Sequence, residues 1–336
     1  MTGRGVTFIL VGLTIAAAVA IAVVAAGDEN GPEPPAAGTA VSCDRIADPG
    51  DDLAEFLSAL STGETGCLSE GEHLAPDGEL KIESPEITLA SAPGTMAKLV
   101  GRVWIAPEAD GVRIQGLELD GRNDRDLPSP TISASGVVLL GNDISNGQSA
   151  TCVSIGGGPG RSSGTIIEGN LIHDCGLLPP TNHHHGIYVA DATDTVIRGN
   201  WIYDNADRGI QLYPNADDTV ITGNVIDDNG EGIIFGGNDS EVSERNLVEG
   251  NVITNSEVRY NVESSWPGNV GGGNLVRGNC VFGGTRNPEG GGIKDPTEGF
   301  VAEENLIADP EYVDRGAADY ALPADSPCRD LLGRNR

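Results

Sequence analysis

The chain has 336 residues, of which only 4% are aromatic, and a formal net charge of −30 from 50 acidic and 20 basic residues. This charge argues against nucleic acid and anionic lipid as partners, because both repel a strongly acidic protein. The low aromatic content and the 48 glycines favour a repeat architecture with thin aliphatic layers over a conventional bulky core.

The N-terminal segment is apolar without interruption from Val6 to Ala26 and is preceded by a single charge, Arg4. Such a segment is typical either of a cleaved signal peptide or of a retained membrane anchor, since it is just long enough to span a bilayer. We predict a signal peptide or anchor over residues 1–27 and a linker rich in Pro, Gly and Ala over 28–42. Residues 43–336 then form one exported domain, located outside the cell or in the cell envelope.

The six cysteines suit an exported protein, because disulfides persist in oxidising compartments. Six cysteines allow 15 pairings, and the sequence does not choose among them. We favour the pairing that joins neighbours along the chain, which is Cys43–Cys67, Cys152–Cys175 and Cys280–Cys328. The sequence contains no CxxC spacing, so a zinc site built on cysteines is not expected.

An internal repeat is visible in a series of Gly-Asn pairs spaced 24 to 30 residues apart. Their asparagines are Asn142, Asn170, Asn200, Asn224, Asn251 and Asn279, and Asn305 continues the series with Glu304 in place of glycine. Aliphatic residues stand three positions before and two positions after these asparagines, as in Ile167 and Ile172 around Asn170. An earlier coil fits the same frame with Leu117 in the position of the asparagine.

The repeat predicts short strands joined by a tight turn, with asparagine side chains stacked from one coil to the next. The aliphatic runs are too short for helices, and the period is too short for the blades of a β-propeller. We therefore expect an all-β fold, a right-handed parallel β-helix. Residues 51–60 have helical spacing and are expected to cap it. We assign the cap to 43–100, the coils to about 101–307, and an irregular C-terminal closure to 308–336.

A second recurring strand covers residues 186–189, 209–212 and 232–235, each beginning Gly-Ile. With alternating side chains, Ile187, Ile210 and Ile233 face the interior. The same pattern predicts two columns of outward-facing side chains. One column contains Tyr188, Gln211 and Ile234, and the other contains His185, Arg208 and Glu231.

The Gly-Asn-x-Ile repeat and the C-terminal sequence from Asn305 to Cys328 resemble the right-handed parallel β-helix, or pectin-lyase-like, superfamily over most of residues 100–330. The resemblance implies the fold and a set of alternative roles: polysaccharide lyase, glycoside hydrolase, uronate epimerase, phage spike or non-catalytic surface protein. The catalytic motifs of the better-known members are absent. Val103-Trp104-Ile105-Ala106 lacks the Asp-His of the pectate lyase pattern, and Asp217-Asp218 lacks the other polygalacturonase motifs.

The clearest departure from the repeat is an insertion at 175–182, which is followed directly by three histidines. Loops on a rigid scaffold usually carry binding and catalytic sites. A lyase would remove a proton with Tyr, His, Lys or Arg, whereas a hydrolase would use two carboxylates such as Asp207 and Glu231. The candidate catalytic residues are His184, His185, Tyr188, Asp207, Arg208 and Glu231, and the candidate substrate-binding residues are His183, Gln211 and Tyr213.

We assign no metal site, although the histidines are of a type that binds transition metals. The acidic loop with Asp120, Asn123, Asp124 and Asp126 is a weaker candidate for Ca²⁺ through oxygen ligands. The sequence predicts an exported, monomeric, carbohydrate-active protein, a polysaccharide lyase or a glycoside hydrolase. The alternative is a non-catalytic envelope or adhesion protein that binds glycans along the same face, and a third is a structural solenoid without a ligand.

Overall fold

The computed structural model describes residues 41–157, 160–264, 269–295 and 297–332. The predicted signal peptide or anchor over 1–27, the linker up to residue 40 and the last four residues lie outside the described residues. Within the described ranges, no helix has the length and apolar character needed to cross a membrane.

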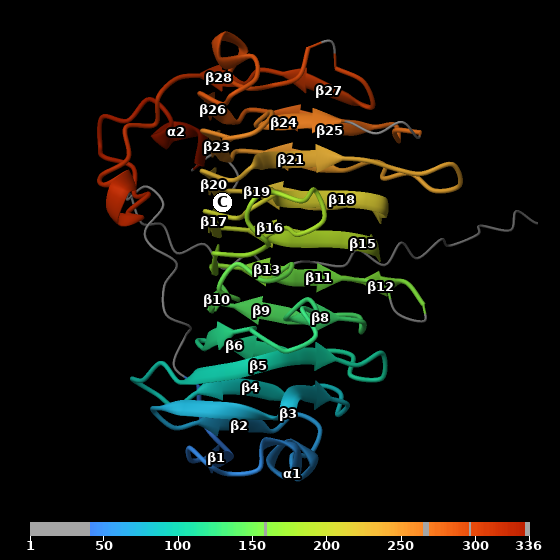
Figure 1. Cartoon of the computed structure of the whole chain (residues 1–336), viewed down its shortest axis with the longest axis vertical. Coiled ribbons are helices and arrows are strands. Elements are labelled where there is room, and N and C mark those ends of the chain that lie inside the picture. Colours follow the sequence, from blue (N-terminus) through green and yellow to red (C-terminus); the bar gives the residue numbers. More distant parts are fainter. Residues whose placement is uncertain (1–40, 158–159, 265–268, 296, 333–336) are drawn as a thin grey trace, which may run out of the picture. The chain divides into compact units, whose positions relative to one another are not determined.

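The described chain winds into coils that stack on one another (Figure 1), and all pairings between its named strands are parallel. One side of the coils is a sheet of 11 strands. These strands are β1 (Arg45–Ala47), β2 (Thr65–Leu68), β4 (Thr88–Ser91), β6 (Arg113–Gln115), β9 (Val138–Leu140), β13 (Ile166–Glu168), β16 (Val196–Arg198), β19 (Val220–Thr222), β22 (Leu247–Glu249), β25 (Asn274–Arg277) and β27 (Phe300–Glu303).

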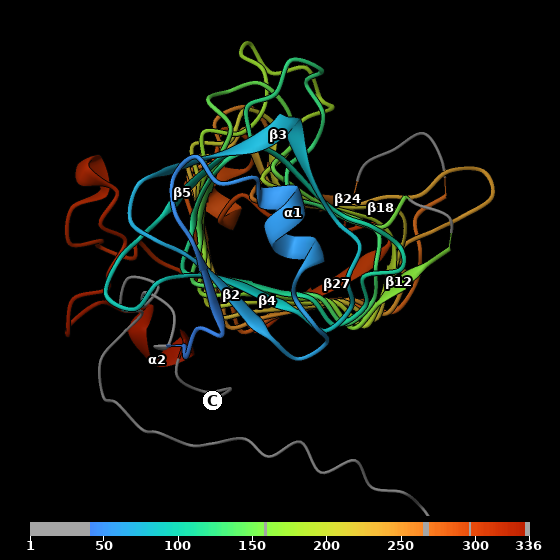
Figure 2. The same ribbon diagram turned by 90° about the horizontal axis from the view of Figure 1, so that it is seen from below.

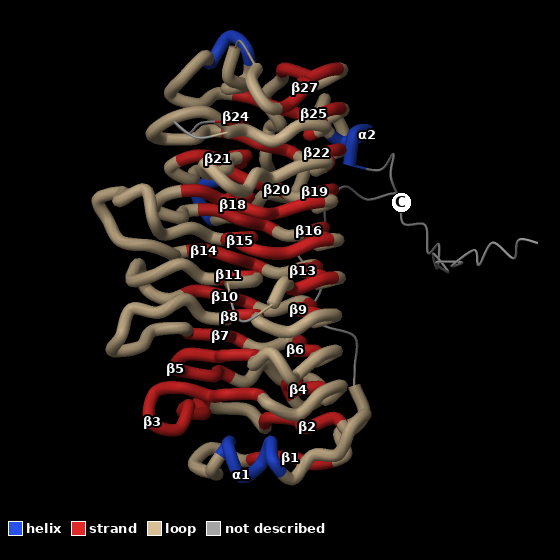
Figure 3. The backbone as a smooth tube through the Cα atoms, turned by 90° about the vertical axis from the view of Figure 1, so that its right-hand side faces the viewer, coloured by secondary structure: helices blue, strands red, loops and turns tan. Residues whose placement is uncertain are grey.

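A second side, which follows the asparagine turn, contains β7 (Glu118–Asp120), β10 (Asp143–Ser145), β14 (Leu171–His173), β17 (Trp201–Tyr203), β20 (Val225–Asp227), β23 (Val252–Thr254), β26 (Cys280–Phe282) and β28 (Leu306–Ile307). The third side contains β8 (Thr131–Ile132), β11 (Val153–Ile155), β12 (Ser162–Ser163), β15 (Ile187–Thr193), β18 (Arg208–Asp217), β21 (Glu231–Phe235) and β24 (Val262–Ser264). The long strands β3 (Glu72–Ile82) and β5 (Lys98–Ile105) join these two sides, because β5 pairs with β7 at its start and with β8 at its end. Figure 3 shows how the strands repeat from coil to coil.

The asparagine ladder is confirmed in hydrogen bonds. Each asparagine side chain donates to the side-chain oxygen of the next one, at 2.9–3.0 Å, from Asn142 through to Asn305. The aliphatic residues that flank the ladder asparagines before the last coil, such as Ile167 and Ile172, are completely buried and form the core inside the coils. The predicted fold class is therefore correct, and the period of the sequence is the period of the coils.

The first coils begin earlier than predicted. Strands β1, β2 and β4 already pair in register with the later coils, so residues 45–100 belong to the solenoid and are not a separate cap. The cap itself is the helix α1 (Leu53–Ser58), which begins after Asp52, whose side chain accepts hydrogen bonds from two backbone N–H groups. Leu53 and Leu57 are buried against the core, and Figure 2 shows α1 lying across the end of the coils.

The sequence suggested that the C-terminal segment closes the last coil, but the segment does not lie over that end. It runs beside the coils (Figure 1), where its short helix α2 (Arg329–Leu332) follows the disulfide Cys280–Cys328. Tyr320 packs there in a cluster with Trp201 and Tyr203, on the outer face of β17. The segment 309–332 covers this face because the outward residues of β17, β20 and β23 are unusually apolar.

The last coil is consequently left uncovered by the described chain. Ile307 continues the interior column of aliphatic residues but is 52% exposed, and its neighbour Leu306 is 37% exposed. All three disulfides join the cysteines that the sequence favoured, Cys43–Cys67, Cys152–Cys175 and Cys280–Cys328.

Candidate functional site

The inserted loop at residues 176–184 lies between β14 and β15, and its base is held by the disulfide Cys152–Cys175. The carboxylate of Asp207, from the next coil, organises its tip. Asp207 accepts hydrogen bonds from the backbone N–H groups of Asn182, His183 and His184 at 2.7, 2.8 and 2.8 Å. Both carboxylate oxygens are used in this way, so Asp207 fixes the position of the loop.

A chain of alternating charges continues from this loop across three coils. The guanidinium of Arg208 donates to the backbone oxygen of Asn182 at 2.8 Å and to Glu231 at 3.0 Å. The other oxygen of Glu231 lies 2.8 Å from Arg259, which also donates to Glu263 at 2.6 and 2.7 Å. Arg208, Glu231 and Glu263 are buried, whereas the Arg259 side chain is 41% exposed. Buried charges require such partners, because an uncompensated charge is costly away from water.

The backbone register places these groups on top of one another. Arg208 pairs with Glu231 between β18 and β21, as predicted, and Ile233 pairs with Val262 in β24. The coils approach closely here: a Cβ atom at Gly232 would lie 2.2 Å from the backbone oxygen of Asn261. Glycine at the start of this strand therefore allows the stacking that brings Glu231 next to Arg259.

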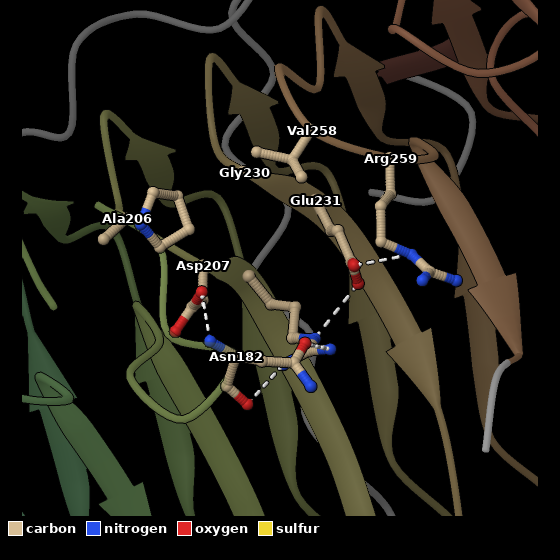
Figure 4. A pocket seen from close by; sticks show the side chains of 9 residues that line it. Asn182, Ala206, Asp207, Gly230, Glu231, Val258 and Arg259 are labelled. Atoms are coloured by element: carbon tan, nitrogen blue, oxygen red, sulfur yellow. Dashed lines mark hydrogen bonds and ion pairs between the residues drawn. The ribbon is translucent and has the colours of Figure 1, made fainter. Parts of the chain in front are cut away.

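A pocket of about 110 Å³ opens above this chain of charges (Figure 4). Pro180, Ala206 and Val258 supply its apolar lining, while Asn182, Asp207, Arg208, Glu231 and Arg259 supply its polar lining. Its volume holds several waters and is well below that of a site enclosing a whole drug-sized ligand. It suits one group of a larger ligand that lies across the face of the coils.

Burial controls the charge states around the pocket. It raises the pKa of the Glu231 carboxyl above its ordinary value, against the opposing effect of Arg208 and Arg259. Burial, together with the charge of Arg208, lowers the pKa of His185 well below its ordinary value, so His185 is neutral. Burial, assisted by Tyr213, raises the pKa of Tyr188 to about 12.

The structure brings only part of the predicted site together. Asp207, Arg208 and Glu231 line the pocket. His183 is exposed on the loop and His184 is half-buried, but His185 is buried beneath it, 5.7 Å from Tyr188 between ring centroids.

Tyr188 and Gln211 do form the predicted column, since they pair in register with each other and with Ile234. However, Gln211 and Ile234 are buried, so most of this column is covered instead of being open to solvent. Tyr213 lies two residues further along β18 and is half-buried. Neither the tyrosines nor Gln211 line the pocket.

Sequence reasoning missed Asn182, Val258, Arg259 and Glu263. The repeat of the Gly-Ile strand is degenerate in this coil, where Asn261-Val262-Glu263 takes the place of Gly-Ile-Ile. The sequence did contain one signal for this part of the site. Arg259 and Glu263 are opposite charges four residues apart, and they lie one coil beyond Glu231.

No group of three His, Cys, Asp or Glu side chains that could hold a metal ion occurs in the part of the chain that the structure describes. In the acidic loop predicted as a Ca²⁺ candidate, Asp120 pairs with Arg122 and Lys98. Asn123 accepts hydrogen bonds from the backbone N–H groups of Arg125 and Leu127. These contacts use the side-chain oxygens of Asp120 and Asn123 as structural acceptors.

Residues 115–294, more than half of the chain, match the family described as right-handed β-helix region, and the chain therefore belongs to this family. The crystal structure of pectate lyase Pel9A is similar, with a TM-score of 0.63 and 14% identity over 88% of this chain and 91% of that chain. The crystal structure of the Dettilon tailspike protein has a TM-score of 0.51 and 15% identity, over 80% of this chain and 63% of that chain. No curated protein matches the sequence. These similarities establish the fold.

Proposed function

We propose that this protein binds a polysaccharide across the side of the coils formed by β15, β18 and β21, and that one sugar enters the pocket at the inserted loop. The observation that carries the proposal is the pocket itself. It combines the polar side chains of Arg208, Glu231 and Arg259 with an apolar lining. A sugar ring has polar hydroxyl groups and apolar C–H faces, so it matches both kinds of lining. A similar β-helix is a pectate lyase, which agrees with a carbohydrate ligand.

Binding is favoured over lyase chemistry because no strong base lies at the pocket within the described residues. A lyase needs an unprotonated group that removes a proton from the sugar. Arg208 and Arg259 are paired with carboxylates, and the phenol of Tyr188, whose pKa is raised to about 12, stays protonated at neutral pH. His185 is neutral but lies under the loop and not in the pocket.

Glycoside hydrolysis is the second candidate, and the raised pKa of Glu231 favours it. A carboxyl group with a raised pKa holds its proton to a higher pH than an ordinary glutamate, which helps it to protonate a leaving sugar oxygen. Asp207 would be the second carboxylate, although its oxygens already hold the loop.

We also infer that the protein acts outside the cytoplasm, in the cell envelope or extracellular space, as a monomer. The three disulfides support this location, because such bonds are rare in reducing compartments.

The test is a screen of the full-length protein against neutral and acidic polysaccharides by isothermal titration calorimetry, with assays for reducing ends and unsaturated products. Arg259→Ala should weaken binding roughly tenfold or more, the scale of one charge-assisted hydrogen bond. Arg277→Ala is the matched control, because Arg277 is 42% exposed and is likewise paired with a glutamate, Glu249, on another side of the coils.

Loss of binding in Arg259→Ala alone supports the proposal, and no binding to any polysaccharide by the wild type refutes it. If the wild type releases reducing ends and Glu231→Gln does not, the protein is a glycoside hydrolase and the proposal of binding without catalysis is wrong. Unsaturated products would instead establish a lyase.

A further inference from the structure

The charges and walls of the pocket specify which kind of sugar it takes. Two guanidinium groups, those of Arg208 and Arg259, stand among three carboxylates, those of Asp207, Glu231 and Glu263. Each guanidinium is already bound to at least one of these carboxylates at 3.0 Å or less. The cationic charge that would otherwise attract an acidic sugar is thus neutralised within the protein.

An acidic sugar would bring a fourth carboxylate to this place, on a chain whose net charge is already −30. Like charges in a partly buried site repel strongly, because water screens them only incompletely. The site therefore disfavours polyuronates on electrostatic grounds.

The apolar lining carries the positive part of the argument. Val258 is an aliphatic side chain that lines the pocket and is 43% exposed, so an apolar surface lies beside the charged groups. Pro180 and Ala206 also contribute apolar lining to the pocket. The side chain of Arg259 is 41% exposed, and its guanidinium is a hydrogen-bond donor. Figure 4 shows Val258 beside Glu231 and Arg259, so an apolar and a polar surface meet within one small recess.

We infer that the pocket accepts the acetyl group of a neutral, acetylated sugar, with the methyl group against Val258 and the carbonyl oxygen toward Arg259. This inference rests on the proposed polysaccharide binding and names its substrate class. An acetyl group has the required pair of features, an apolar end and an acceptor without charge. A hydroxyl group in its place would leave the apolar lining without contact, and a carboxylate would meet the surrounding carboxylates.

The experiment measures the affinity of the full-length protein for three probes: O-acetylated xylan, the same xylan after mild alkaline deacetylation, and polygalacturonate. We expect acetylated xylan to bind at least about tenfold more tightly than the deacetylated form, the scale for one small apolar group in a fitted pocket. Polygalacturonate should bind more weakly than acetylated xylan. Val258→Asn should reduce the affinity for acetylated xylan to that of the deacetylated form.

Val313→Asn is the control, because Val313 is an exposed valine of the C-terminal segment, at 57%; it should preserve the difference between the two xylans. Equal affinity for both xylans, or tighter binding of polygalacturonate, would overturn the inference. If either of these results is accompanied by loss of binding in Arg259→Ala, the proposed polysaccharide binding stands and only the acetyl specificity fails. Absence of binding to every probe and to the wider polysaccharide panel refutes both.

Discussion

Two histidines of one coil, His173 in β14 and His185 before β15, acquire opposite charge preferences from their surroundings. Burial opposes protonation of His173, but hydrogen bonds to Asp143 at 2.9 Å and Asp174 at 2.8 Å outweigh it and raise the pKa of His173. His173 also stacks on Tyr203, with ring centroids 5.0 Å apart. At His185, by contrast, burial and the positive charge of Arg208 act in the same direction, so its pKa is lowered.

This contrast predicts a pH dependence of stability that belongs to His173. Because its pKa is raised in the folded state, its stabilising contribution is complete below the unfolded value of about 6.5 and is lost as the pH rises through the folded pKa. We expect His173→Gln to cost about 1–2 kcal/mol at pH 5.5, the scale of a charge-assisted hydrogen bond, and clearly less at pH 8.5. Urea unfolding of both proteins at the two pH values measures this difference.

The lowered pKa of His185 also makes stability depend on pH, but this contribution is the same in the wild type and in His173→Gln and cancels in the comparison. A cost of His173→Gln that is the same at pH 5.5 and pH 8.5 would contradict the prediction.

At the scale of elements, the tight turns are stabilised by stacked asparagines, and there are more ladders than the Gly-Asn series. Asn205 donates to Asn229 at 2.8 Å, and Asn246 donates to Asn274 at 2.9 Å, each at another corner of the coils. Every such side chain satisfies buried backbone groups of the neighbouring coil, which would otherwise be costly. The ladders therefore fix the register between coils whose strands are only a few residues long.

Substitution in the middle of the main ladder should be much more costly than at its end. Asn200 accepts from the backbone N–H of Asn170 and donates to the backbone oxygen of Ile167, both at 2.9 Å and both buried. Asn200→Ala leaves these groups without partners and should destabilise the protein by about 3 kcal/mol. Chemical denaturation followed by circular dichroism measures the change.

Asn305→Ala provides the comparison, because Asn305 makes the equivalent bonds in the last coil but is only half-buried. Water can replace its side chain, so we expect a cost of about 1 kcal/mol or less. Equal costs at both positions would show that the ladder does not act through burial of unpaired backbone groups.

At the scale of the whole described molecule, the two ends of the solenoid differ. Helix α1 covers the N-terminal end, whereas the C-terminal segment lies along the side, tied by Cys280–Cys328 and by the ion pair of Arg315 with Asp227 at 2.6 Å. The segment thus covers an apolar face of the middle coils and leaves Ile307 exposed at the end.

The disulfide should hold this segment in place without being needed by the coils. In Cys280→Ser/Cys328→Ser we expect docking of the segment to weaken by about 2–4 kcal/mol, the usual scale for a native disulfide. Trp201 is 4% exposed, and its ring centroid lies 5.6 Å from that of Tyr320. In the variant Trp201 should become solvated, and its fluorescence should shift to the red. The β-sheet signal in circular dichroism should persist.

The same red shift should be absent in a Trp201→Phe background, which assigns it to this residue. Cys152→Ser/Cys175→Ser is the control, because that disulfide lies at the inserted loop and not under the C-terminal segment. Loss of β-sheet signal in the Cys280 and Cys328 variant would mean that the segment is part of the folding core.

The sequence alone determined the coils, the main asparagine ladder and the inward aliphatic residues, whereas the favoured disulfide pairing was decided by the structure. These features recur at each turn of the chain, and every coil obeys the same local rules of burial and turn geometry, so the period reveals them. It also located the inserted loop, because the loop interrupts that period, and it predicted the pairing of Arg208 with Glu231.

Only the tertiary structure decided what covers each face. Val258 and Arg259 reach the pocket from a coil whose motif is degenerate, and Asp207 serves the loop from the coil after it. Arg315 meets Asp227 across 88 residues of chain. Such contacts join segments that share no repeat, so they leave no periodic signal, and the burial and charge of the site depend on them.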